Sequence, residues 1–354
     1  MMTYQFKYFC LAFLIISPFG VIFSQSTASE RLAQINAFEE IDQHVRDCPK
    51  EINSDAGQLV EYFSQVAETD LEKARSIYVW LADNISYNVK SINKNKFGDN
   101  SAEGVLKSKK AVCAGYAALF DFLGKKMNLE IREVGGYSKN ANDEQEWYFV
   151  DEEPGHAWNV IKINGAWKVF DATWGAGNGD IDKRGKLVFT KKYKEQWFNL
   201  GPYEAIFTHY PEDTSFMFTN PKITLEEYEK FPNVSIIAFT SGLLDAEESF
   251  QQSVNKPAIK YPVVYDMELD DFEVLQSPKN WRMKRRKNHT FEFAVSNVLD
   301  IYLYENDDLK DTFKKKNEGQ NFTLEYMSKE KTKIDIVIKT LEGELFTLLE
   351  YENY

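Results

Sequence analysis

The sequence predicts an α+β protein in which a core of helices and antiparallel strands precedes a β-rich, sandwich-like C-terminal domain. Apolar residues recur every three or four positions in the first third of the chain, as in amphipathic helices. A hairpin signal lies near the middle, and short runs rich in Val, Ile, Phe, Tyr and Thr fill the last third. The 354 residues are enough for about two domains.

Composition favours packed domains and excludes one class of function. The chain is 43% hydrophobic and 15% aromatic, whereas disordered chains are poor in both kinds of residue. It has 42 Lys+Arg against 55 Asp+Glu, and its formal net charge is -13. Binding that depends mainly on nucleic-acid phosphates requires a basic surface. We therefore expect no nucleic-acid partner.

The N-terminus has the layout of a signal peptide. Lys7 precedes an uncharged stretch at residues 8–23, and small polar residues follow at 24–26. The uncharged stretch is shorter than the roughly 20 residues that a membrane-spanning helix needs. We therefore expect residues 1–24 to be cleaved from a secreted or periplasmic protein that does not span the membrane, which lowers the net charge to -14. A retained anchor is the alternative.

Helices dominate the expected structure before residue 130. The apolar spacing predicts helices at residues 29–45, 56–66 and 71–84, with Thr69 or Asp70 as the N-cap of the third. The polar segment 90–100 is expected to be a loop. Asn100, with Glu103 three residues later, is expected to cap a short helix through Leu106. A further helix is expected from Cys113 to Met127.

Strands are expected from residue 130 to residue 174 and again from about residue 234 onward. Between them, residues 175–182 are expected to form a flexible loop and residues 224–230 a helix. The predicted divisions are a signal peptide at 1–24, a helical lead-in at 25–54, a core at 55–235 and a β-rich domain at 236–354.

A basic run at residues 279–287 follows an acidic run at residues 266–273. We interpret the basic run as a solvated loop that connects two strands, and a binding patch is the alternative.

Cys113 is a candidate nucleophile because it opens a predicted helix. The N-terminus of a helix carries unpaired N–H groups and partial positive charge, which stabilise a thiolate. The apolar stripe of this helix leaves an alternative, in which Cys113 is a small buried hydrophobe. A catalytic thiol also requires a base that accepts its proton.

The hairpin supplies a base and its partner. Asn164-Gly165 forms a two-residue turn, and strand pairing that extends from it places His156 opposite Thr173. His156 and Asp171 then lie on the same face as diagonal neighbours, roughly 7–8 Å apart at the backbone. Cys113, His156 and Asp171 are the residues that a catalytic triad requires. The alternatives are a plain cross-strand pair and a turn role for Asp171.

Three motifs resemble those of the transglutaminase-like superfamily, most closely the secreted bacterial relatives of kyphoscoliosis peptidase. They are Ala111-Val112-Cys113-Ala114-Gly115-Tyr116-Ala117, His156-Ala157-Trp158-Asn159 and Asp171-Ala172-Thr173-Trp174-Gly175. The similarity extends over residues 55–235 and includes segments 74–87 and 209–211. The family usually has Gly at position 111 and Asp at position 88, where this chain has Ala111 and Asn88.

The resemblance implies a papain-like core with Cys113 as nucleophile, His156 as general base and Asp171 as the residue that orients the base. It also implies an oxyanion site made of the Cys113 backbone N–H and a second donor. The candidates for that donor are Tyr87, Trp80 and Trp158.

The expected function is a secreted thiol-dependent acyl-transfer enzyme, a peptidase or transglutaminase-like enzyme that acts on amides through a thioester, with hydrolysis preferred. The expected partner is a protein or peptide substrate, with cell-wall peptides among the candidates. The alternative is a noncatalytic protein-binding scaffold on the same fold. A disulfide between Cys48 and Cys113 is a further alternative, which we disfavour because it would consume the nucleophile.

No cofactor or metal is expected. His44, His209 and His289 lack partners at zinc-ligand spacing, and we interpret His209 as structural. The glycine-rich segment 175–179 lacks the Lys-Ser/Thr of a phosphate loop. Asp180 and Asp182 give weak support for calcium binding.

Overall fold

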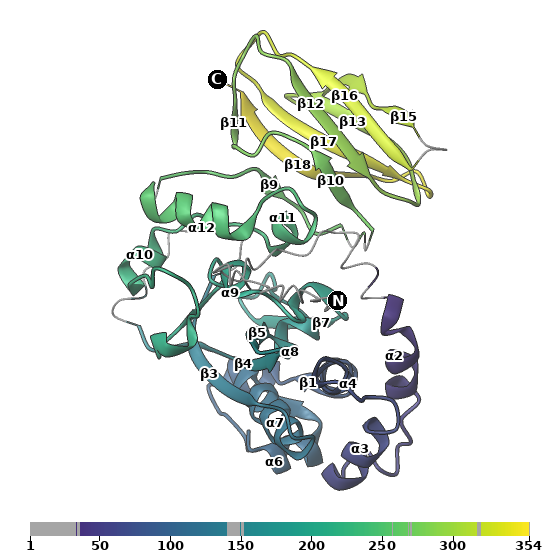
Figure 1. Ribbon diagram of the computed structural model, residues 1–354, viewed down its shortest axis with the longest axis vertical. Helices are drawn as coiled ribbons and strands as arrows, with labels where there is room; N and C mark the ends of the chain where they lie inside the picture. The colour runs from purple at the N-terminus through teal and green to yellow at the C-terminus, as the bar shows by residue number, and fades with distance from the viewer. Residues whose placement is uncertain are drawn as a thin grey trace, which may run out of the picture.

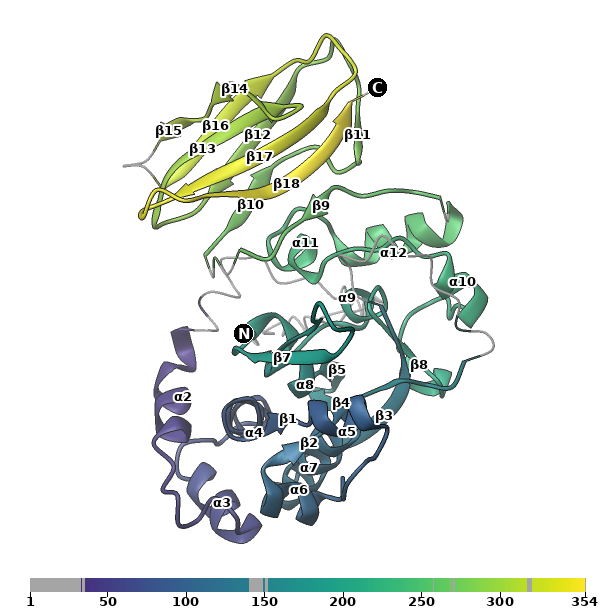
Figure 2. The same cartoon turned by 180° about the vertical axis from the view of Figure 1, so that it is seen from behind.

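A computed structural model describes residues 33, 36–139, 149, 152–256, 258–267, 269, 271–316 and 320–353 (Figures 1 and 2). The expected signal peptide lies outside these residues. Within the described ranges, no helix combines the length and the apolar character needed to cross a membrane.

The N-terminal half is mainly helical. Its elements are α2 (Glu39–Arg46), α3 (Ala56–Phe63), α4 (Asp70–Asn84), α5 (Val89–Lys94), α6 (Ala102–Ser108) and α7 (Cys113–Lys126). Thr69, one of the two predicted N-caps, caps α4, and it does so in a capping box with Glu72. The expected loop at 90–100 is wrong in part, because Asn88 caps α5 there. The cap of α6 is Ser101, one residue after the predicted Asn100.

A buried arginine ties α2 and α4 to a later segment. Arg75 on α4 is 1% exposed, and its guanidinium lies 2.7 Å from both oxygens of Asp42. It also lies 2.6 Å from Glu195, on the 3-10 helix η1 (Glu195–Trp197). Because η1 borders the site described below, this network connects the helical half to it.

The central sheet has four antiparallel strands in the order β5-β4-β3-β8: β3 (Ile131–Ser138), β4 (His156–Ile163), β5 (Ala166–Phe170) and β8 (His209–Pro211). Asn164 and Gly165 have φ of 50° and 81°, and Ile163 pairs with Ala166 as predicted. The strand β5 ends at Phe170, however. The predicted pairing of His156 with Thr173 is therefore wrong.

Short elements connect this sheet to the C-terminal region. They are α8 (Ala172–Gly175), β6 (Gly177–Ile181), β7 (Leu187–Lys191), α9 (Pro202–Ala205), η2 (Thr214–Phe216), α10 (Leu225–Glu229), α11 (Ile236–Thr240) and α12 (Ala246–Asn255). Two expectations need correction. Residues 177–181 form a hairpin strand instead of a loop, and residues 236–255 contain two helices instead of strands.

The C-terminal region is rich in strands, as predicted. One sheet contains β10 (Glu273–Gln276), β12 (His289–Ala294), β16 (Asn321–Tyr326) and β15 (Lys314–Lys316). The other contains β11 (Arg282–Met283), β18 (Leu345–Asn353), β17 (Lys333–Thr340), β13 (Val298–Glu305), β14 (Asp308–Thr312) and β9 (Val263–Val264). The rings of Phe291 on β12 and Tyr351 on β18 meet at 5.8 Å between the sheets.

Two hydrophobic clusters fill the described part of the molecule. One packs α2–α4, α6 and α7 against a face of the central sheet. The other is continuous from the opposite face, through residues 200–250, to both C-terminal sheets. In both views, α11 and α12 lie between the central sheet and those C-terminal sheets. The C-terminal region is therefore packed onto the rest of the chain, and the predicted division after residue 235 stays a prediction.

Candidate active site

Cys113 is the first residue of α7. The two-stranded parallel sheet of β1 (Ser86–Tyr87) and β2 (Lys110–Ala111) fixes the chain directly before it. A backbone N–H at the start of a helix has no acceptor within the helix, so that of Cys113 remains available. The Cys113 thiol is partly buried and lies 3.9 Å from the carbonyl oxygen of Gly155.

His156 begins β4, next to Gly155. Farther along this strand, Asn159 donates to the carbonyl of Ala117 at 3.0 Å, which holds β4 against α7. The His156 imidazole lies 2.7 Å from Asp171 through Nε2 and stacks on Trp174 with ring centroids 5.0 Å apart. Sequence and packing thus bring His156 to the start of the helix that carries Cys113.

Asp171 acts as a helix cap and as the partner of His156 at the same time. Its Oδ1 accepts the backbone N–H groups of Thr173 and Trp174 at 2.9 and 3.0 Å, which caps α8. Its Oδ2 faces His156. The end of β5 at Phe170 turns the chain so that both contacts form. The predicted neighbours His156 and Asp171 therefore meet, by a route other than strand pairing.

The interpretation of His209 as structural misses its contact with Asp171. His209 lies on β8 and is 2% exposed, and its Nε2 approaches the same Asp171 oxygen at 3.1 Å. Its Nδ1 lies 2.8 Å from the hydroxyl of Thr208. His209 follows Asp171 by 38 residues and reaches it because β8 pairs with β3. The local sequence carries no signal of this contact.

The charges of this cluster depend on Asp171. Burial alone would lower the pKa of His156. The charge and the hydrogen bond of Asp171 outweigh burial and raise this pKa, and Cys113 raises it further. Burial opposes the ionised form of Asp171, yet His156 and His209 hold its pKa well below the ordinary value. Burial lowers the pKa of His209. We therefore assign Asp171 as ionised and His209 as neutral, with Nε2–H donating to Asp171.

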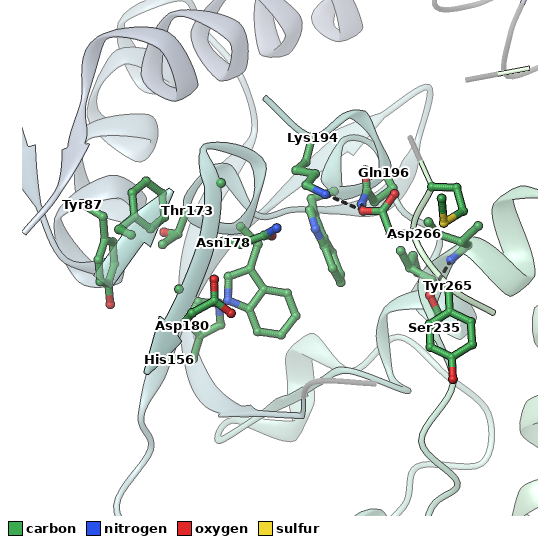
Figure 3. Close-up of a pocket in the computed structure, with 18 of the residues that line it drawn as sticks. Tyr87, His156, Thr173, Asn178, Asp180, Lys194, Gln196, Ser235, Tyr265 and Asp266 are labelled. Carbon is green, nitrogen blue, oxygen red and sulfur yellow. Dashed lines mark hydrogen bonds and ion pairs between the residues drawn. The ribbon is translucent and has the colours of Figure 1, made fainter. Parts of the chain in front are cut away.

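A cavity of about 700 Å³ opens beside His156 (Figure 3). Tyr87, Trp174 and Trp197 are among its lining residues. Its far wall comes from the segment 265–267 and from residues 346 and 347 of the C-terminal region. Lys194 and Asp266 pair at 2.5 Å across it, as the dashed line in Figure 3 shows.

The three candidate oxyanion donors lie in different places. Tyr87 lines the cavity, and burial, with contributions from Cys113 and Asp171, raises its pKa. Its hydroxyl therefore stays protonated and can donate. Trp158 is 3% exposed beneath His156, with ring centroids 6.0 Å apart. Trp80 is fully buried in the helical cluster, and its indole N–H donates to Asn53.

Cys48 and Cys113 are both free thiols, so no disulfide joins them. The disulfide alternative is therefore wrong. Cys48 lies after α2, and its Sγ contacts Asn53 at 3.5 Å. Burial raises the pKa of this thiol, and Lys109 opposes the change.

His156, Asp171 and His209 could also supply metal ligands, since the three atoms lie within 4.8 Å of one another. Two imidazoles and a carboxylate are ligands that zinc accepts. However, both nitrogens lie at 2.7 and 3.1 Å from one oxygen, which is the spacing of N–H···O hydrogen bonds. The arrangement fits a hydrogen-bonded cluster whose nitrogens share one acceptor.

Comparison with known proteins adds the family. Residues 57–172 match the model of the transglutaminase-like superfamily. This part of the chain is similar to the transglutaminase-like domain. The matched range contains Cys113, His156 and Asp171.

The chain is 28% identical to mouse kyphoscoliosis peptidase over 226 residues, which is 63% of this chain and 33% of that protein. It is 29% identical to hillarin of Drosophila melanogaster over 60% of this chain and 27% of hillarin. The match thus spans about a third of the length of these transglutaminase-like relatives. A solved structure described as a TGase is 20% identical, with a TM-score of 0.29, and the match covers 47% of this chain and 41% of that one.

Proposed function

We propose that this transglutaminase-like protein is a thiol-dependent acyl-transfer enzyme that acts on amide bonds of proteins or peptides. The observation that carries the proposal is the position of His156 at the edge of a cavity, 2.7 Å from Asp171 and directly after Gly155, whose carbonyl oxygen lies 3.9 Å from the Cys113 thiol. A thiol nucleophile, a base and an oriented carboxylate are the groups that amide cleavage through a thioester requires.

In the proposed first step, the Cys113 thiolate attacks the amide carbonyl carbon and forms a tetrahedral oxyanion. We assign the Cys113 backbone N–H and the Tyr87 hydroxyl as the donors to that oxygen. His156 then passes its proton to the leaving amine, and the C–N bond breaks to leave a thioester. Asp171 keeps the imidazole oriented and balances its positive charge.

In the second step, water or an amine attacks the thioester carbonyl. His156 takes a proton from the attacking group, and the Cys113 thiolate leaves. Water gives a carboxylic acid, as in a peptidase, and an amine gives a new amide, as in a transglutaminase. We prefer hydrolysis, because water reaches any open cavity.

We further propose that the protein works outside the cytoplasm. The basic start, the apolar stretch and the small polar residues at 24–26 support a cleaved signal peptide. Mass spectrometry of the protein from its native source should give an N-terminus at residues 24–27. An intact Met1 in the purified protein would contradict secretion by cleavage.

The test of the activity uses casein and a dansylated alkyl amine as substrates. New N-termini measure cleavage, and fluorescence bound to casein measures transfer to an amine. We expect one of these products with the native protein, none with Cys113→Ala, and unchanged rates with the control Cys48→Ala. Turnover that survives in Cys113→Ala would overturn the proposal, and so would the absence of both products with casein and with a lysate of cell-surface proteins.

A further inference from the structure

A second cavity, of about 850 Å³, lies in the C-terminal region and shares no residue with the cavity at His156. Residues 258–260, 278–284, 287 and 289 line it. Five of the lining residues are cationic: Lys260, Lys279, Arg282, Lys284 and Lys287. Among the described residues that line it, none is acidic. The basic run at 279–287 is therefore one wall of a cavity and more than a solvated loop.

Most of this positive charge is not neutralised locally. Arg282 lies 3.1 Å from Glu352, and Lys279 lies 3.4 Å from Glu248. For the side chains of the other three cations, Lys260, Lys284 and Lys287, the described part of the chain provides no ion pair. The whole protein is acidic, at -13. Cations gathered around a hollow focus a local positive potential and attract anions.

The backbone holds the cavity walls in place. Trp281 donates its N–H to the carbonyl of Lys260 at 3.1 Å and accepts the N–H of Glu352 at 2.9 Å. β11 continues this contact by pairing Arg282 and Met283 with the end of β18. Across the loop, His289 Nε2 lies 2.9 Å from the carbonyl of Lys284. A frame fixed before binding reduces the entropy cost of binding.

The cavity also has an apolar part. Trp281 is half-buried, and Ile259, Pro278 and Met283 lie in the same lining. Fixed polar or charged groups around an apolar, aromatic wall are typical of sites for organic ligands. The volume exceeds that of a single sulfate or phosphate ion. The cationic side chains and the aromatic ring of Trp281 together indicate a ligand with anionic groups attached to a ring structure.

We propose that this cavity binds a short segment of an anionic polysaccharide, with its sulfate, phosphate or carboxylate groups on the lysines and one sugar ring against Trp281. The concave shape favours a polymer segment over a flat membrane surface. A long nucleic acid would extend beyond the cavity, where the acidic remainder of the protein repels it. The inference stands on the second cavity alone and is independent of the proposed activity.

The test is a calorimetric titration with a heparin octasaccharide, at low salt and at 150 mM salt. We expect saturable binding that weakens with salt, and no binding of the neutral maltooctaose. The double variant Lys284→Glu/Lys287→Glu should bind at least about tenfold more weakly, because it reverses two charges next to the anion. Lys314→Glu/Lys316→Glu reverses two exposed charges on β15, outside the cavity, and should bind within about twofold of the native protein.

Two further variants and ligands separate the glycan from other polyanions. Trp281→Ala keeps every charge and should weaken binding of the octasaccharide about threefold to tenfold, with an unchanged melting temperature as the control for folding. A single-stranded oligonucleotide and vesicles with anionic phospholipid should bind more weakly than the octasaccharide. The proposal would be overturned if both double variants lost octasaccharide affinity equally, or if Trp281→Ala had no effect on binding in a folded protein. Tighter binding of the oligonucleotide or of the vesicles than of the octasaccharide would also overturn it.

Discussion

Replacement of His209 by leucine should separate packing from chemistry in the buried cluster. The change removes a hydrogen bond of 3.1 Å to the ionised Asp171 and leaves the Thr208 hydroxyl without its imidazole partner. A hydrogen bond to a charged group contributes about 1.5–3 kcal/mol. The Thr208 hydroxyl keeps the Ala205 carbonyl as its acceptor at 3.2 Å, so the loss of its imidazole contact adds little. The three aromatic rings around His209, of Trp158, Trp174 and Trp197, limit relaxation. We therefore expect His209→Leu to lower the free energy of unfolding by about 1.5–3 kcal/mol.

The same change should reduce the reactivity of Cys113. Without His209, Asp171 is held by fewer donors and orients His156 less well. If about 1.4 kcal/mol of this loss reaches the imidazole, alkylation of Cys113 by iodoacetamide at pH 7 slows about tenfold. His209→Gln is the rescue variant, because its amide N–H can occupy the position of Nε2, and it should react within about threefold of the native protein.

Urea denaturation and mass-spectrometric alkylation rates provide the two measurements. Stability and reactivity should fall together in His209→Leu and recover together in His209→Gln. A leucine variant that loses stability but alkylates Cys113 at the native rate and with the native pH profile would refute this reasoning. His209 would then serve packing alone.

Two other substitutions test the charges around the site. Asp171→Asn should lower the pKa of His156, because the carboxylate raises it, and NMR titration of the imidazole should follow the change. A histidine whose pKa is raised in the folded state stabilises the fold fully below the unfolded pKa near 6.5, and this stabilisation is lost as pH rises through the folded pKa. In urea titrations, Asp171→Asn should therefore lose more free energy of unfolding at pH 6 than at pH 10. Arg75→Met should lower the free energy of unfolding by about 3–5 kcal/mol, because Asp42 and Glu195 lose their shared buried partner. A loss below about 1 kcal/mol would show that the ion pairs of Arg75 contribute little to stability.

Local signals in the sequence predicted much of the fold. Thr69 or Asp70 as an N-cap predicts the start of α4, and Asn164-Gly165 predicts the register of β4 and β5. Both depend on hydrogen bonds and dihedral preferences within a few residues, which a sequence displays directly. The apolar spacing along the helix predicts the start of α7 at Cys113.

The rest depends on contacts between distant segments. The end of β5 at Phe170 follows from the capping of α8 by Asp171, which competes with strand pairing. The position of His209 requires β8 to pair with β3 across about 70 residues of chain. The helix α11 consists of strand-like residues, and its burial in the second hydrophobic cluster outweighs local propensity. The helix α12 does carry a local signal, the N-cap Asp245, which the strand prediction overlooks.

The pH dependence of Cys113 alkylation tests the proposed chemistry most directly. Iodoacetamide labelling from pH 4 to pH 10, with the adducts on both cysteines quantified by mass spectrometry, compares the native protein with His156→Ala. The account predicts that Cys113 reacts well below neutral pH in the native protein and loses this reactivity in His156→Ala. Cys48, whose pKa burial raises, serves as the internal control and should react only at alkaline pH in both proteins. If Cys113 reacts only at alkaline pH, like Cys48, and does so equally in His156→Ala, the chain has no activated thiol and the proposed acyl-transfer function is contradicted.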